Sequence, residues 1–260
     1  MENFCLFIIY SIIGLIIETL FRLLTKGVIE SRKSFVYGPF CAIYGLGASV
    51  MIACLKPLGK NDTAIFIGGI LVGTITEYLV SFFGEIMLHV KWWDYSDLPL
   101  NINGRVCLLY SVMWGFLALF LMKIVNPYID KAINYLKNKW TAKVGKIILS
   151  VSIVLLAIDW IISTVIVGVF LVRTIHNYDL PVKNRPAIEL VYNTIYQYPV
   201  ISDFFKEHYS DERMIKTFPN MKVEDVQGNM IYFKDLMPQI KPYYIKVFNT
   251  DMFKFLENKE

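Results

Sequence analysis

Residues 64–88 read AIFIGGILVGTITEYLVSFFGEIML, a long apolar run in which Glu77 and Glu85 are the only charged side chains. A bilayer core of roughly 30 Å is crossed by about 20 apolar helical residues, so this run is long enough to span it. Similar runs occupy the remainder of the first two thirds of the chain, at residues 3–24, 37–55, 104–124 and 147–171. We therefore predict an all-α, polytopic integral membrane protein with five transmembrane helices.

The composition excludes an ordinary soluble domain. The 260 residues are 55% hydrophobic and only 18% charged, and the mean hydropathy is +0.47. A formal net charge of +4 suits contact with the lipid bilayer, and no nucleic-acid-binding motif accompanies it. The first run lacks a basic start and a cleavage site, so we expect it to stay as a helix. Because the four cysteines show no CxxC spacing, we expect no disulfide, metal or cofactor.

Two pairs of segments indicate an internal repeat. GLIIETLFR (residues 14–22) aligns with GTITEYLVS (73–81), and each places a glycine before a glutamate at the same spacing. GPFCAIY (38–44) aligns with GRVCLLY (104–110), so that glycine, cysteine and tyrosine match. We predict that residues 1–124 are a tandem duplication of a helical hairpin.

This duplication has a topological consequence. Each unit crosses the membrane twice, so the two copies enter from the same side. Glu18 and Glu77 then become counterparts, and the loops 25–36 and 89–103 lie on one membrane face. We expect the polar groups of both loops to converge there.

Carboxylates within the apolar runs need partners. A charged group at the bilayer centre costs about 2.5–3.5 kcal/mol, and both Glu77 and Asp159 fall inside predicted spans. The purely structural interpretation is that these acids fix helix register through hydrogen bonds. At the end of the first run, Glu18 and Arg22 have the spacing of an ion pair within one helix.

The connecting stretch 89–107, HVKWWDYSDLPLNINGRVC, is unusually rich in distinctive side chains for a loop. Its tryptophans suit an aromatic belt at the membrane surface, but its acid, amides and arginine suggest binding of a zwitterionic or anionic headgroup, or of another small polar molecule. The candidate site residues are Glu18, Arg22, Arg32, Glu77, Glu85, Trp93, Asp94, Asn101 and Arg105.

Arg105 is placed unfavourably if it opens a helix, because the helix dipole disfavours a cation there by a few tenths to about 1 kcal/mol. We therefore expect a partner in a binding site to hold Arg105, and we expect Asp94 to belong to the same site. The alternative is that Arg105 and Asp94 form a buried structural pair. Glu85 and His89 stand one helical turn apart, but no third metal ligand is evident.

Residues 10–125 resemble the CmpB-like family of ABC-transporter permeases, through YGPFCAIYGLGA and the WWDYS and N-x-x-G-R elements of the stretch above. The resemblance implies transport, in a bacterial membrane, with a separate ATPase subunit or a homo-oligomer as partner. Ser34 and Ala42 depart from its pattern, in which we expect glycine and proline. The matching residues are Glu18, Gly38, Pro39, Tyr44, Gly45, Glu77, Glu85, Trp92, Trp93, Asp94, Tyr95, Asn101, Gly104, Arg105 and Trp114.

The rest of the chain divides in three. Residues 125–146 predict an amphipathic helix on an anionic leaflet, residues 147–171 the fifth transmembrane helix, and residues 172–260 a small, mostly helical extramembrane region with a hairpin about Gln227 to Asn229. Lysines and arginines together are nearly balanced between the two faces, and we favour a cytoplasmic N-terminus in the cell membrane. We expect the C-terminal region to lean on the membrane helices.

Two classes of function follow. In the first, the chain is a membrane transport component with a polar site near one face. In the second, it is a membrane-embedded enzyme or lipid-handling protein, in which Glu85, Asp94 and Arg105 act on a headgroup. A regulatory or scaffold subunit is a further alternative. There is no Gly-rich phosphate loop with its lysine, so we do not expect this chain to hydrolyse ATP.

Overall fold

The computed structural model describes residues 2–88, 93–139 and 142–248, and it is all-α apart from two small antiparallel sheets. The helices of the membrane region are α1 (Glu2–Lys26), α2 (Ala42–Leu55), α3 (Asp62–Leu88), α4 (Leu108–Phe120), α5 (Asn126–Lys139) and α6 (Ala142–Asn177). The C-terminal region holds α7 (Arg185–Tyr196), α8 (Pro199–His208), α9 (Asp211–Thr217) and α10 (Phe233–Leu236). The strands are β1 (Val28–Ile29), β2 (Lys222–Glu224), β3 (Met230–Tyr232) and β4 (Ile245–Lys246).

The first four helices pair as two hairpins, α1 with α2 and α3 with α4, and glycines let each pair approach closely. A Cβ added at Gly14 would lie 2.2 Å from the Cβ of Tyr44, and one added at Gly73 would lie 2.5 Å from Cγ of Trp114. A ring therefore rests directly on the backbone of the facing helix in both hairpins, as in the small-residue packing of membrane helices.

Four stretches of helix are long and apolar enough to cross a membrane: Phe4–Lys26, Asp62–Ile86, Leu108–Lys139 and Lys143–Asn177. Their outer surfaces are apolar, and Leu24 on α1 and Phe116 on α4, for example, are exposed. The chain is accordingly a multi-pass membrane protein by length and composition of its helices.

The second predicted span, residues 37–55, is shorter than expected, because helix α2 begins only at Ala42. Its 14 residues extend about 21 Å at 1.5 Å per residue, and a 3-10 turn, η1 (Lys56–Leu58), follows. The count of five spans is thus not established by the structure. The physical reason is that residues 30–41 form a non-helical segment with bends at 34–38, here called the extended segment, which is held against α6.

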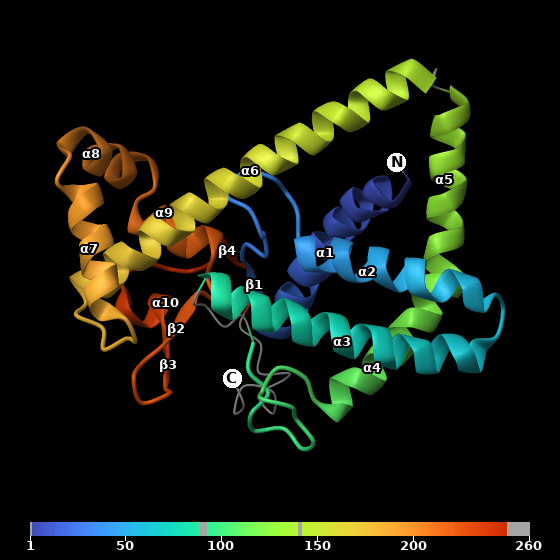
Figure 1. The fold of residues 1–260 in the computed structure, drawn as a ribbon, viewed down its shortest axis with the longest axis horizontal. Coiled ribbons are helices and arrows are strands. Elements are labelled where there is room, and N and C mark those ends of the chain that lie inside the picture. The colour runs from blue at the N-terminus through green and yellow to red at the C-terminus, as the bar shows by residue number, and fades with distance from the viewer. Residues whose placement is uncertain (1, 89–92, 140–141, 249–260) are drawn as a thin grey trace.

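Helix α4 does not stop where the predicted fourth span ends. It passes through a π-helical turn, η2 (Leu121–Val125), directly into α5. In Figure 1, α5 stands at the right edge and joins the hairpins to one end of α6, and the C-terminal elements gather round the other end of α6. Helix α6 therefore runs the length of the molecule.

Asp159, near the middle of α6, anchors the extended segment 30–41. Its carboxylate accepts hydrogen bonds from the backbone N–H of Gly38 at 2.7 Å and of Tyr37 at 3.4 Å. The Ser163 hydroxyl donates to the same carboxylate at 3.1 Å and accepts from the Val36 N–H at 2.8 Å. The partner that Asp159 was expected to require is therefore the backbone of residues 37 and 38, at the start of the second predicted span.

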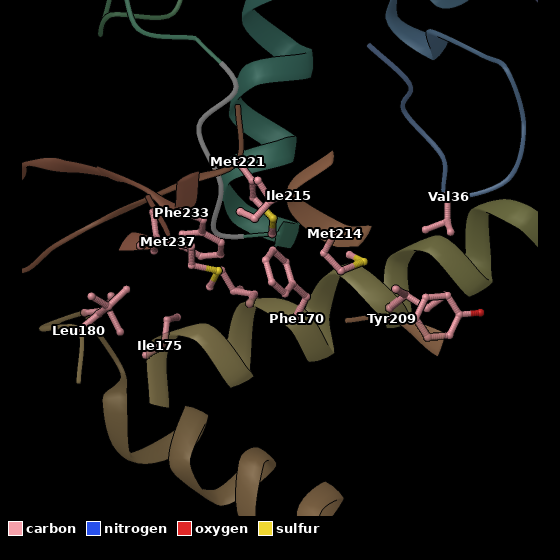
Figure 2. Packing of buried hydrophobic residues seen from close by; sticks show 14 residues of the cluster. Val36, Phe170, Ile175, Leu180, Tyr209, Met214, Ile215, Met221, Phe233 and Met237 are labelled. Carbon is pink, nitrogen blue, oxygen red and sulfur yellow. The ribbon is translucent and has the colours of Figure 1, made fainter. Parts of the chain in front are cut away.

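The C-terminal region has its own apolar core, built on the last turns of α6 (Figure 2). Phe170 and Ile175 of α6 meet Met214 of α9 and Phe233 of α10, and Val36 of the extended segment joins the same cluster. Strand β4 also pairs antiparallel with β1. The region thus leans on the membrane helices, as expected.

Local sequence explains the shape of this region. Pro199 starts α8 and separates it from α7, and β2 pairs with β3 round Gly228, whose φ of 89° suits glycine. The Tyr37 and Tyr209 hydroxyls share a hydrogen bond, and burial together with this bond raises the pKa of Tyr209 to about 12. The predicted hairpin about Gln227 to Asn229 is present.

Replacing Asp159 with Asn should release the extended segment from α6. The amide loses the negative charge that strengthens both backbone hydrogen bonds, and bonds to charged groups contribute about 1.5–3 kcal/mol each. We expect faster amide hydrogen exchange across residues 34–40 and a lower melting temperature. Ser152→Ala is the matched control on α6, since that hydroxyl bonds only to its own helix at Ile148. Unchanged exchange in residues 34–40 would contradict the anchoring role.

Candidate functional site

The first group of site residues centres on Glu18, which lies on α1 beneath the extended segment. Arg32 approaches one carboxylate oxygen with Nε at 3.0 Å and a terminal nitrogen at 2.9 Å. The Tyr44 hydroxyl of α2 donates to the other oxygen at 2.7 Å. Both charged side chains are 22% exposed, so this ion pair is largely withdrawn from solvent.

The ion pair expected between Glu18 and Arg22 does not form. Arg22 instead pairs with Glu30 at 2.7 Å and donates to the Asn220 side chain at 3.2 Å, and Arg32 lies 3.6 Å from the same Glu30 carboxylate. The extended segment runs back across α1 and brings Arg32 to Glu18 and Glu30 to Arg22. Residue spacing within α1 cannot reveal these partners. Glu30 and Asn220 are thus site residues that sequence reasoning missed.

A cavity of about 740 Å³ opens beside the ion pair of Glu18 and Arg32. Its walls come from α1, α2 and α6, from the extended segment, and from the turn after α9 at residues 217–221. Glu18, Arg32 and Trp93 of the predicted site line it, and Lys33 and Cys41 do so too. Deeper in the membrane region the walls are apolar, with Phe7, Leu46 and Leu156 among them.

Glu77, the predicted counterpart of Glu18, is buried in the second hairpin at 7% exposure. It accepts hydrogen bonds from the Trp114 indole at 2.9 Å and from the Tyr95 hydroxyl at 3.0 Å. Burial and the nearby Glu77 raise the pKa of Tyr95, which therefore stays a donor at neutral pH. No arginine or lysine is paired with Glu77 in the described chain, and Glu77 does not line the cavity near Glu18.

Asp94 and Asn101 shape the loop that contains them. The Asp94 carboxylate accepts from the Ser96 N–H at 3.0 Å and its hydroxyl at 2.6 Å. Asn101 donates to the Ser96 and Leu98 carbonyls and accepts from the Gly104 N–H at 3.1 Å. Gly104 has a φ of 67°, and a Cβ there would lie 2.5 Å from Asp94. These contacts are those of a turn built by side-chain to backbone bonds.

Arg105 does not begin a helix, because α4 starts at Leu108. Its guanidinium pairs with Glu85 of α3 at 2.6 Å and lies 5.7 Å from the ring centres of both Tyr78 and Phe82. The Trp93 indole donates to the Arg105 carbonyl at 2.9 Å. The expected pairing of Arg105 with Asp94 in a binding site is thus replaced by an ion pair that fastens the loop to α3.

The predicted site residues therefore form separate groups. Glu18, Arg22 and Arg32 lie together near the first cavity, Glu77 lies between α3 and α4, and Glu85 borders a second hollow of about 760 Å³ between α6 and α7. Within the described residues no cluster of histidine, cysteine and carboxylates could hold a metal ion. His89, the proposed partner of Glu85, and Trp92 lie outside the described residues.

Comparison with known proteins gives one match. A family model with the description "Putative ABC-transporter type IV" matches residues 5–164. The match covers the two hairpins, α5 and α6 as far as Thr164, and thus Asp159 and all nine predicted site residues. No curated protein matches the chain, and neither does any solved structure.

The Glu85–Arg105 pair should behave as one structural unit. Each partner is less than a third exposed, with 17% of the arginine and 28% of the glutamate side chain accessible. Either Arg105→Gln or Glu85→Gln should lower the unfolding free energy, and the double variant should cost less than the sum, by about 1 kcal/mol. Thermal unfolding in detergent measures this coupling.

The control for this cycle is the exposed pair Glu212 and Lys216 in one turn of α9. Its coupling should be smaller than that of Glu85 and Arg105, because solvent screens an exposed pair on a helix surface. Strictly additive effects of Glu85→Gln and Arg105→Gln would show that the two side chains are independent, and would return Arg105 to the candidates for ligand binding.

Proposed function

Because the chain belongs to the ABC-transporter family described as type IV, we propose that it is the membrane-spanning permease component of a transport system and binds its substrate beside Glu18 and Arg32. The observation that carries this proposal is the cavity of about 740 Å³. It combines apolar walls within the membrane helices with a charged end near the extended segment. Substrate pockets commonly join such walls to a few polar groups that fix orientation.

The ion pair at the cavity wall suits reversible binding. Glu18 and Arg32 satisfy each other when the cavity is empty of substrate, and each retains 22% exposure through which a polar ligand can compete. An arginine presents several donors in a planar fork, which matches carboxylate or phosphate oxygens. A ligand that takes up Arg32 would leave Glu18 with the Tyr44 hydroxyl.

The walls of the cavity are also suited to movement. The extended segment 30–41 is held on α6 by Asp159 and Ser163, and on α1 by Glu18. A shift of α6 relative to the two hairpins would therefore move this segment and change access to the cavity. We propose that this segment is the gate of the permease.

Energy for transport has to come from elsewhere, since the sequence contains no Gly-rich phosphate loop with its lysine. We propose a separate ATPase subunit, or a homo-oligomer that works with one, as partner. The alternative of a headgroup-directed enzyme rested on Glu85, Asp94 and Arg105, and these three are engaged in the contacts that build and fasten the loop. A regulatory or scaffold role has no particular contact in its favour.

The tandem duplication is part of this proposal. In both hairpins a glutamate accepts a hydrogen bond from an aromatic side chain of the partner helix, Tyr44 for Glu18 and Trp114 for Glu77. In the view of Figure 1, α1 and α3 run from right to left and α2 and α4 run back. These features support hairpins of the same direction, but Trp114 stands one helical turn beyond the residue that aligns with Tyr44.

For orientation, we propose a cytoplasmic N-terminus in the cell membrane. The loop 56–63 and helix α5 would then face the cytoplasm with their lysines, and the motif loops and C-terminal region would lie outside. In a variant without native cysteines, Ser34→Cys and Asp97→Cys should react with an impermeant thiol reagent added to intact cells. Lys60→Cys should react only after the cells are opened. Labelling of positions 34 and 97 from opposite sides would overturn both the topology and the shared face.

Neutralising the ion pair should impair transport beyond what any loss of folded protein explains. We expect Glu18→Gln and Arg32→Gln to lower transport at least tenfold (roughly 1.4 kcal/mol) per molecule of folded protein, because loss of one partner of a largely buried pair also lowers stability. Cells that lack the chain would be complemented with each variant, and the small molecules and lipids of cells and medium compared by mass spectrometry. Lys216→Gln, on the surface of α9, is the matched control. Restoration of the wild-type composition by both site variants would reject this site.

A further inference from the structure

We infer that the cavity beside Glu18 and Arg32 binds an anionic amphiphile, a molecule with an acyl chain and a phosphate-bearing headgroup, drawn sideways from the bilayer. This inference rests on the proposed function, because it names the substrate class of the same site. It is carried by the dimensions of the cavity, by its division into an apolar and a charged end, and by the surplus of positive charge at the charged end.

The cavity is elongated along α6. Ile153 and Val167 both line it, and at 1.5 Å per residue the helix advances about 21 Å between them. One leaflet of a bilayer contributes about 15 Å of a hydrocarbon core that is roughly 30 Å thick. The cavity is therefore long enough for a chain that lies alongside α6 through one leaflet, with room beyond it for a headgroup.

The two ends differ in chemistry. Phe7, Leu46 and Ile153 line the end toward the N-terminus of α6, where the contacts are apolar. Ser31, Arg32 and Lys33 line the other end, next to the turn after α9. A purely polar solute would leave the first end empty, and a purely apolar one would desolvate the second, which is costly for unpaired polar groups.

The charged end of the cavity has one more cation than carboxylates. The charged residues that line the cavity are one carboxylate, Glu18, and two cations, Arg32 and Lys33. Arg32 is paired with Glu18, whereas the Lys33 ammonium has no ion pair or hydrogen bond in the described part of the chain. The surplus favours an anion, and a lysine ammonium recognises phosphate as a point charge.

A route from the membrane exists on the α6 side. Trp160 lines the cavity and still keeps 55% of its surface exposed, and Ile161, the next residue along α6, is also exposed. This face of α6 is apolar and falls in the middle of a helix long enough to span the bilayer. An amphiphile can therefore enter with its chain in contact with lipid throughout.

The test measures binding to the full chain in detergent by native mass spectrometry. The probes are dioleoyl phosphatidylglycerol, dioleoyl phosphatidylcholine at equal concentration, and inorganic phosphate. We expect phosphatidylglycerol to bind at least tenfold more tightly than phosphatidylcholine, and phosphate alone not to displace it. Equal binding of the two lipids would show that the site does not select an anionic headgroup and would reject the inference. Displacement of the lipid by phosphate would assign the site to a free anion.

Two pairs of variants locate the bound lipid. Lys33→Gln should weaken phosphatidylglycerol binding roughly tenfold, as expected for loss of one charge-assisted contact. Lys33→Arg keeps the charge and should retain binding. Lys183 is an exposed lysine of the C-terminal region, so Lys183→Gln should leave binding unchanged. Ala157→Phe fills the cavity wall and should abolish binding, and Val154→Phe, which is exposed on α6 and does not line the cavity, should not. Unchanged binding in Ala157→Phe would place the lipid elsewhere and reject the inference.

These measurements need no transport. Binding that follows the expected pattern, together with full complementation by Glu18→Gln and Arg32→Gln, would keep the lipid site and reject it as the transport site. Loss of transport in those variants, with no preference for phosphatidylglycerol, would keep the permease and reject the amphiphile.

Discussion

A carboxylate inside a membrane helix needs hydrogen-bond donors, and the arrangement of this protein follows from how three carboxylates find them. Asp159 uses the backbone of the extended segment, Glu18 uses Arg32 and Tyr44, and Glu77 uses Tyr95 and Trp114. In each case donors come from outside the helix that carries the acid, and Ser163 of α6 adds a local donor to Asp159. Because an unpaired charge in hydrocarbon is expensive, these bonds fix where the loops lie on the helices.

The two motif loops have different tasks as a result. In the second loop, residues 93–107, the polar side chains mainly stabilise the loop itself. Asp94 and Asn101 close turns, and Arg105 binds Glu85 of α3. The first loop is stretched between α1 and α6, and its arginine and lysine border an open cavity. These contacts favour the proposed binding site beside the first loop over one beside the second, although the second carries the more distinctive sequence.

The cavity depends on α6 standing at a distance from the hairpins. The contacts of α6 are made chiefly with the C-terminal elements and the extended segment, not with α1 to α4. The C-terminal region thus completes the site: its turn after α9 closes one end of the cavity, and Asn220 supports Arg22. A region outside the matched family segment is in this way part of the wall that a substrate would meet.

The sequence alone determined the class of the protein, because apolar runs of membrane length, glycines that admit a facing helix and acids within those runs are local properties. It also predicted the mostly helical C-terminal region and its hairpin from the local residue pattern. Ion-pair partners were decided by the tertiary structure: local spacing suggested Glu18 with Arg22, whereas Arg32 returns to Glu18 only after the chain has left α1 and run back across it. The shortness of α2 has the same origin, since residues that are apolar enough for a span are drawn into an extended segment by the carboxylate of Asp159. Such pairings depend on long-range geometry that residue spacing does not encode.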